Sequence, residues 1–153
     1  LRQALRLLDA QGVTLHVAVL GETGLMGDGW KHITHTELGV RRGDAAIAAA
    51  YQSADFFVNP STNDNGPMMV GEALVCGVPV VATDEGGARE VVRDGEDGVH
   101  VRAKDPESIA DGIRRLLIDN EERLRMAEAA RRRTLSWEER CGELFDVLRY
   151  IKD

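Results

Sequence analysis

The sequence has few of the features that mark a disulfide-rich, metal-binding or membrane protein. Two cysteines occur in 153 residues, and Cys76 and Cys141 lie far apart without the spacing of metal ligands. We therefore predict two free thiols in a reduced, cytoplasmic protein. No apolar run approaches the length needed to cross a membrane, and no signal peptide opens the chain.

An excess of positive charge is also absent, since 26 Asp and Glu outnumber 19 Lys and Arg, the net charge is −7 at pH 7 and the pI is about 5.1. Nucleic acids and anionic membrane surfaces require a basic face, so we expect neither as a partner. The basic cluster at residues 131–133 falls in an expected helix and is interpreted as its solvated face. A small anionic ligand remains compatible with this charge, because it needs only local hydrogen-bond donors.

The distribution of apolar residues indicates a single domain with one core, for which the length is sufficient. Short apolar runs predict strands at residues 13–20, 31–37, 55–59, 78–82 and 99–101. Helical spacing predicts helices at residues 1–11, 44–53, 67–75, 86–92, 106–117, 121–134 and from 136 onward. Asp44 and Asp105 are expected to be N-caps, and Tyr51 is expected on an apolar helix face.

Strands and helices that alternate in this way imply an α/β fold. We expect a Rossmann-like parallel sheet of about five strands with helices on both faces. In such sheets, ligands bind beyond the carboxyl ends of the strands. Functional residues are therefore expected in the loops at residues 21–29, 38–43, 60–68 and 83–87.

Two carboxylates frame the start of the helix that follows the third expected strand. Asp64 and Glu72 are separated by seven residues, and Pro67 suits a first helical turn. The amides of Met68 and Met69 would be unpaired donors in that turn. Such donors can bind a sugar hydroxyl or a phosphate oxygen, with help from the helix dipole.

Gly66 and Glu72 extend this pattern on either side of the helix start. Gly66 has no Cβ, so the backbone can come close to a ligand. Glu72, one turn into the helix, can accept two hydrogen bonds from a vicinal diol such as a ribose. Taken alone, the residues also fit a plainer interpretation, in which Asp64 is a loop or capping residue and Glu72 a solvated helix residue.

Other polar groups give weaker signals. The four histidines have no ligand spacing and are interpreted as surface or hydrogen-bonded residues, so no metal site is expected. Residues 21–24 are similar to a phosphate-binding loop but lack its lysine. Gly86 and Gly87 fit either amide donors in a cleft or a tight turn from strand to helix.

A series of motifs in residues 53–101 points to a known family. In order they are Ala54-Asp55, Pro60-Ser61, Asp64, Gly66, Glu72-Ala73, Cys76-Gly77-Val78-Pro79, Gly86-Gly87, Glu90 and Asp94-Gly95. With Asp105-Pro106 and Ser136-Trp137, they resemble the donor-binding half of retaining, nucleotide-sugar-dependent glycosyltransferases of the GT-B fold. That family includes glycogen synthase, sucrose synthase and bacterial mannosyltransferases, and the resemblance extends over nearly the full chain.

The resemblance implies that residues 1–153 form one domain, the C-terminal half of a GT-B protein without its first strand. The N-terminal acceptor domain would be absent from this sequence, which begins at Leu1 rather than Met and inside a helical pattern. The implied activity is transfer of a hexose from a UDP-, GDP- or ADP-sugar to a glycan, lipid or small acceptor. No metal or cofactor is implied, and any peripheral membrane association would come through the absent half.

The resemblance also implies a role for each site residue. Asp64 would be the catalytic residue that faces the donor sugar, and Glu72 would bind the ribose. Backbone around the helix start would hold sugar hydroxyls and phosphate, and a segment after the second strand would hold the nucleobase. These donor-binding positions are Gly66, Pro67, Met68 and Met69 at the helix start, and Leu38, Gly39 and Val40 after the strand.

The chain departs from the family pattern in two ways. The first acidic position is usually Glu, and Asp64 here resembles the branch with a Gly-Pro-Met-Met type loop that acts in surface polysaccharide or glycoconjugate synthesis. The Arg and Lys that hold the donor diphosphate in the family would precede Leu1. We therefore expect this chain alone to bind a nucleotide sugar weakly without turnover.

Two alternatives remain open from the sequence. A degenerate transferase domain could serve interaction or regulation without catalysis, and the sequence upstream of Leu1 would discriminate it from an enzyme. A nucleotide-sugar epimerase of the same fold should show acid–base residues that this chain lacks.

Overall fold

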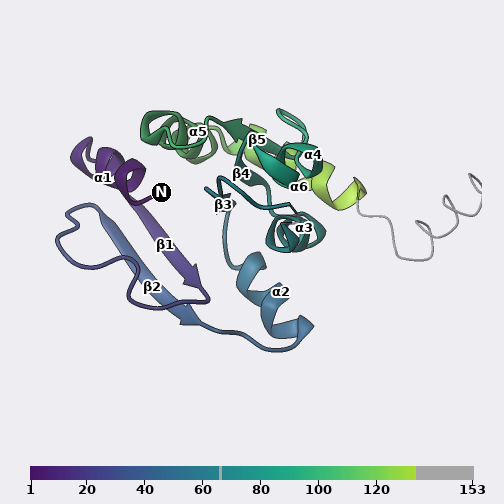
Figure 1. Ribbon diagram of the computed structural model, residues 1–153, viewed down its shortest axis with the longest axis horizontal. Helices are drawn as coiled ribbons and strands as arrows, with labels where there is room; N and C mark the ends of the chain where they lie inside the picture. The colour runs from purple at the N-terminus through teal and green to yellow at the C-terminus, as the bar shows by residue number, and fades with distance from the viewer. Residues whose placement is uncertain (66, 134–153) are drawn as a thin grey trace, which may run out of the picture.

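The computed structural model describes residues 1–65 and 67–133, which contain six helices and five strands (Figure 1). The final helix expected from residue 136 lies outside the described residues. In chain order the elements are α1 (Arg2–Ala10), β1 (Leu15–Leu20), β2 (Ile33–Gly39), α2 (Asp44–Gln52), β3 (Phe57–Asn59), α3 (Met68–Val75), β4 (Val80–Thr83), α4 (Gly86–Val91), β5 (Gly98–Val101), α5 (Pro106–Ile118) and α6 (Asn120–Arg133).

Every strand pair in the described residues is parallel, which confirms the α/β class. The five strands do not form one sheet, however. They form a two-stranded sheet, β1-β2, and a three-stranded sheet in the order β3-β4-β5. The pairing sets Leu15 opposite Ile33 in the first sheet and Val80 opposite Gly98 in the second. No pairing joins β1 to β3 within the described residues.

The three-stranded sheet is covered by helices on both faces, as expected. Val81 and Val101 belong to a cluster with residues of α1 and α5. Val80 and Ala82 belong to a second cluster with residues of α3 and α4. Because successive side chains of a strand point to opposite faces, each helix pair covers one face of β4. All four residues of β4 are consequently buried.

The two-stranded sheet is held to the rest of the molecule through α1 and the loop that follows β1. Arg2 Nη2 donates to the carbonyl of Met26 at 2.8 Å, and Arg6 donates to the carbonyls of Asp28 and Gly29 at 2.9 and 3.0 Å. The guanidinium of Arg6 also lies 4.0 Å above the Trp30 ring. These contacts order a glycine-rich loop that has no secondary structure of its own.

Helix starts test the two capping predictions. Asp105 caps α5, since its Oδ1 accepts the Ser108 N–H at 3.0 Å and Pro106 follows at the first helical position. The prediction for Asp44 is wrong: Gly43 is the N-cap of α2, and Asp44 is the first helical residue. Gly43 has φ +84°, a conformation that glycine adopts readily, so the chain turns into the helix one residue earlier than expected.

Candidate functional site

The segment that joins β3 to α3 is anchored at the carboxyl end of the three-stranded sheet. Asn59, the last residue of β3, is 3% exposed, and its Oδ1 accepts the Ser61 N–H at 3.2 Å. The hydroxyl of Thr83, at the end of β4, donates to the carbonyl of Ser61. The segment therefore leaves the sheet at the edge where ligands bind in open parallel α/β folds.

The Asp64 segment is also packed closely against the start of α4. The Gly87 N–H donates to the carbonyl of Asp64 at 2.8 Å. A Cβ on Gly86 would lie 2.6 Å from that carbonyl oxygen, and a Cβ on Gly87 would lie 2.7 Å from Pro67 Cδ. Of the two interpretations of these glycines, the structure supports the tight strand-to-helix turn. The Gly87 amide serves the protein's own backbone, and the glycines let two loops lie in contact.

Helix α3 begins one residue later than expected. Pro67 is its N-cap rather than its first helical residue, with φ −71° and ψ 81°. The helical hydrogen bonds begin with the amides of Val70 and Gly71, which donate to the Pro67 carbonyl at 3.0 and 3.3 Å. The amides of Met68 and Met69 precede that ladder, as the sequence predicted. The two residues are 76% and 49% exposed, so the first turn of this helix faces solvent.

Glu72 lies one turn further along α3 and is held by a residue of the neighbouring helix. Its Oε2 accepts a hydrogen bond from the hydroxyl of Tyr51 on α2 at 3.0 Å. Tyr51 is 4% exposed, and its ring meets Phe57 edge-on, with 5.4 Å between the centroids. Burial, and then the Glu72 carboxylate, raise the pKa of Tyr51 well above its ordinary value, so the phenol keeps its proton and remains a donor.

Tyr51 is the site residue that the sequence did not reveal. It was expected only as part of an apolar helix face. The contact joins residues 21 positions apart on two helices, and local sequence carries no signal for such a pair. The interpretation of Glu72 as a solvated helix residue is incomplete, because the residue is only partly exposed and its carboxylate accepts a hydrogen bond from Tyr51.

The segment expected to hold a nucleobase lies on the other sheet. Leu38 and Gly39 are the last residues of β2 rather than loop residues, and only Val40 follows the strand. The strand is longer than expected because the Gly21 N–H donates to the Gly39 carbonyl at 3.0 Å, which extends the pairing. Val40 is 74% exposed. Gly66 lies outside the described residues.

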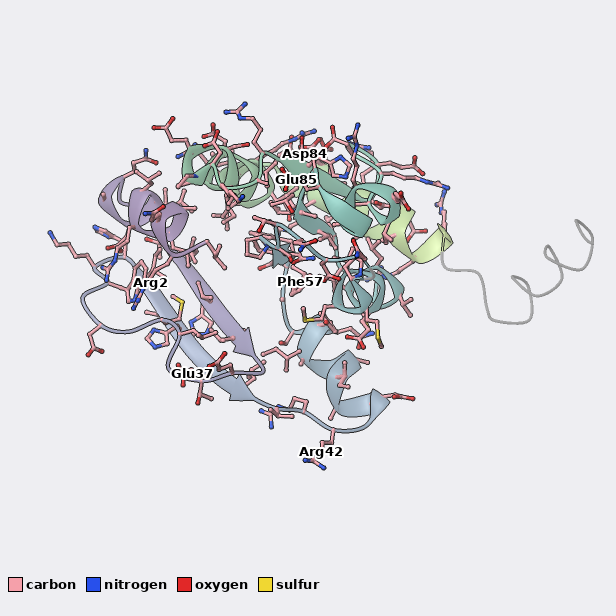
Figure 2. All side chains as sticks on the ribbon, in the orientation of Figure 1. Arg2, Glu37, Arg42, Phe57, Asp84 and Glu85 are labelled. Carbon is pink, nitrogen blue, oxygen red and sulfur yellow. The ribbon has the colours of Figure 1, made fainter. Side chains whose placement is uncertain are left out.

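Figure 2 shows the side of the two-stranded sheet and the side of the three-stranded sheet. Glu37 marks the end of β2, whereas Phe57, Asp84 and Glu85 lie on the side of the three-stranded sheet. Within residues 1–65 and 67–133, no group of three or more His, Cys, Asp or Glu side chains is placed to hold a metal ion. The same residues include no helix long and apolar enough to cross a membrane.

Sequence comparison identifies relatives of the chain. The sequence pattern of the family described as "Glycosyl transferases group 1" matches residues 31–133. The D-inositol 3-phosphate glycosyltransferase of Thermomonospora curvata is 39% identical over 109 residues, or 70% of this chain and 25% of the relative. The enzyme of the same name from Corynebacterium glutamicum is 35% identical over 127 residues, 76% of this chain and 30% of the relative. The chain thus spans about a quarter of the length of the curated relatives it matches.

Solved structures resemble the fold. Anabaena HepE in complex with UDP is 28% identical, with a TM-score of 0.58 over 65% of this chain and 26% of that one. The sucrose-phosphate synthase of Thermosynechococcus elongatus is 24% identical, with a TM-score of 0.68 over 98% of this chain and 43% of that one. The second likeness concerns the fold alone, and it extends over nearly all of the chain.

Proposed function

Because the chain belongs to the glycosyl transferases group 1 family, we propose that it is the donor-binding part of a retaining glycosyltransferase. The full-length protein would transfer a hexose from a UDP-, GDP- or ADP-sugar to a glycan, lipid or small acceptor in the cytoplasm. The observation that carries the proposal is the open start of α3, with Asp64 on the segment before it and Glu72 one turn behind it. The solved complex of HepE with UDP supports a nucleotide ligand.

Each group at this helix start has a proposed task. The amides of Met68 and Met69 bind oxygens of the sugar or the diphosphate, because unpaired N–H groups and the helix dipole both favour anions there. Glu72 accepts hydrogen bonds from the ribose. Asp64 faces the donor sugar as the catalytic residue, and Gly66 and Pro67 bring the backbone close to it.

The nucleobase would lie toward the end of β2, at Leu38, Gly39 and Val40. In the proposed reaction an acceptor hydroxyl attacks the anomeric carbon on the face from which the diphosphate departs. The α3 amides stabilise the charge that grows on the diphosphate, since preorganised donors cost no reorganisation during reaction. The Arg and Lys expected upstream of this sequence would share that task, and neither a metal nor a cofactor is proposed.

One further strand would complete the sheet. The orders β1-β2 and β3-β4-β5 are compatible with the doubly wound order 3-2-1-4-5-6, in which β2 and β1 would take positions 3 and 2, and β3, β4 and β5 positions 4, 5 and 6. Position 1 would then lie between β1 and β3. A strand there, followed by α1 and then β1, would make a βαβ unit of the usual right-handed kind. We propose that the full-length protein supplies this strand together with an N-terminal acceptor domain.

Calorimetry tests the proposed function. UDP, GDP and ADP are titrated into the full-length protein, its Glu72→Ala variant and a Glu121→Ala control that removes an exposed carboxylate from α6. We expect one nucleotide to bind the wild type and the control equally, and the Glu72 variant more weakly. Absence of binding by all three proteins would refute a donor-binding role, and an unaffected Glu72→Ala variant would refute the ribose contact.

Turnover tests the enzymatic part separately. The full-length protein should release nucleoside diphosphate from the matching nucleotide sugar when an acceptor is present, and the product should keep the anomeric configuration of the donor. If the folded full-length protein binds the nucleotide but releases no product with a glycan, a lipid or a small acceptor, it would instead be a binding or regulatory module.

A further inference from the structure

The contact between Tyr51 and Glu72 is unusual for a carboxylate on a helix surface. A Glu side chain left in water keeps several rotamers, and fixing it costs about 1–2 kcal/mol of conformational entropy. Here the hydroxyl that fixes it belongs to a side chain that is itself 4% exposed and packed edge-on against Phe57 of β3. Glu72 is therefore held by a donor that has almost no freedom of its own.

The geometry divides the two carboxylate oxygens between different partners. The Tyr51 hydroxyl donates to Oε2 at 3.0 Å. An ionised carboxylate offers about four lone-pair positions on its two oxygens, so Oε1 and one lone pair of Oε2 remain for a ligand. A diol that approaches this carboxylate would meet an acceptor with a fixed orientation and one partly occupied oxygen.

We infer that Tyr51 is a positioning residue for nucleotide recognition: its hydroxyl fixes the Glu72 carboxylate so that the remaining acceptor positions meet the hydroxyls of a ribose. The inference rests on the ribose role of Glu72 in the proposed function. Tyr51 does not touch the ligand, and it acts only by removing the alternative orientations of Glu72. Preorganisation of this kind strengthens binding because less entropy is lost when the ligand arrives.

A purely structural role of Tyr51 and a positioning role predict different effects on nucleotide binding. If Tyr51 only packs α2 against α3, loss of its hydroxyl should change the stability of the protein and affect all nucleotides alike. If it orients Glu72, the loss should weaken most strongly the ligands that carry all the ribose hydroxyls that Glu72 binds. The preference for ribose over deoxyribose is therefore the informative quantity.

The test measures that preference in the full-length protein. The diphosphate among UDP, GDP and ADP that binds is titrated beside its 2′-deoxy and 3′-deoxy analogues, into wild type, Tyr51→Phe, Glu72→Ala and the double variant. We expect Tyr51→Phe to weaken ribonucleotide binding about 3- to 10-fold. This is less than the loss of a direct hydrogen bond to a charged group would cause, because Tyr51 acts only through the orientation of Glu72. Binding of each deoxy analogue should be weakened less than binding of the ribonucleotide, because each analogue lacks one of the hydroxyls that Glu72 binds. Tyr51→Phe should have no further effect in the Glu72→Ala background, because the two residues act as one unit.

A Phe57→Leu variant supplies the matched control. It removes the edge-on ring contact but leaves the Tyr51 hydroxyl, so it should lower the thermal midpoint and keep the ribose preference. The inference is overturned if Tyr51→Phe weakens all three ligands equally, or leaves the preference intact while Glu72→Ala abolishes it. If the wild type binds no nucleotide, or Glu72→Ala keeps the full preference, the proposed role of Glu72 fails and the inference falls with it.

Discussion

The three-stranded and two-stranded sheets of this chain differ sharply in burial. All four residues of β4 are buried, whereas β1 alternates half-buried residues such as Val17 with exposed ones such as His16. In β2, residues 34–37 are all exposed. Parallel sheets are normally covered on both faces, and here the three-stranded sheet is the better covered of the two. The α3 start, Asp64 and Glu72 all lie on the side of that sheet.

The loops next to the two sheets are also held in different ways. At the three-stranded sheet, the short side chains of Asn59 and Thr83 bond the backbone of Ser61. The Gly87 amide also donates to the Asp64 carbonyl, and glycines allow this close approach.

Next to the two-stranded sheet, the long side chains of Arg2 and Arg6 hold the loop by donating hydrogen bonds to carbonyls of residues 26–29. Contacts of backbone and short side chains fix positions more tightly than flexible arginines, which suits a segment proposed to orient a ligand.

The largest expected effect comes from one substitution made in both sheets. Val81→Ala in β4 removes a side chain with no exposure and should lower the free energy of unfolding by about 2–3 kcal/mol through lost burial and an unfilled cavity. Val17→Ala in β1 removes a half-buried one and should cost less than about 1 kcal/mol. Denaturant titration measures both. Equal losses would contradict the division into a well-covered and a less covered sheet.

A glycine pair tests the contact between the Asp64 segment and α4. Gly87→Ala should lower the free energy of unfolding by about 1–2 kcal/mol through overpacking against Pro67, and nucleotide binding should weaken as the segment shifts. The matched control is Gly71→Ala in α3, where a Cβ would meet no atom within 4 Å. This change should stabilise the helix by up to about 1 kcal/mol. A Gly87→Ala protein with wild-type stability and binding would show that the close packing has no consequence.

The smallest effect concerns pH and the two-stranded sheet. Asp9 lies on α1 and accepts backbone N–H groups at the start of β2, of which His32 at 2.7 Å is the shortest. The His32 N–H above all, aided by those of Lys31 and Ile33, holds the pKa of Asp9 below its ordinary value. A carboxylate whose pKa is lower in the folded state stabilises the fold at pH values above the ordinary Asp pKa of about 3.9. This stabilisation is lost as the pH falls through the pKa of the folded state.

An Asp9→Asn variant isolates that contribution. It should be less stable than the wild type near neutral pH, and the difference should shrink as the pH falls below about 4. Trp30 fluorescence in a Trp137→Phe background reports on the loop next to β2, since the Trp30 ring lies over Arg6 of α1. A stability difference that stays constant into the acid range would show that the Asp9 charge does not matter.

Sequence patterns predicted most elements around both sheets but little of what joins them. The apolar run of β4 and the Asp105 cap follow from local propensity and local hydrogen bonding, so the structure confirms them. Asp44 fits a cap equally well by residue type, yet Gly43 takes that place because its φ is positive. Residue type identifies the possible N-caps of a helix, but the conformation of the folded chain determines which residue takes that position.

The candidate site shows the same limit. The place of the Met68 and Met69 amides before the first helical hydrogen bonds was predictable, because every helix start has such donors. The Tyr51–Glu72 bond and the Gly87–Asp64 bond each depend on how two separate elements pack, over 21 and 23 positions of sequence. The separation of the strands into two sheets was likewise not predictable from the sequence, since an apolar pattern identifies a strand but not the strand with which it pairs.

The central claim is that a nucleotide sugar is recognised on the side of the three-stranded sheet, at the start of α3. Amide hydrogen exchange of the full-length protein, with and without the nucleotide sugar that it binds, tests this most directly. We predict that the ligand slows exchange most strongly at Met68 and Met69, with weaker protection at the end of β2. Protection confined to β1 and β2, with no change at the two α3 amides, would contradict the account.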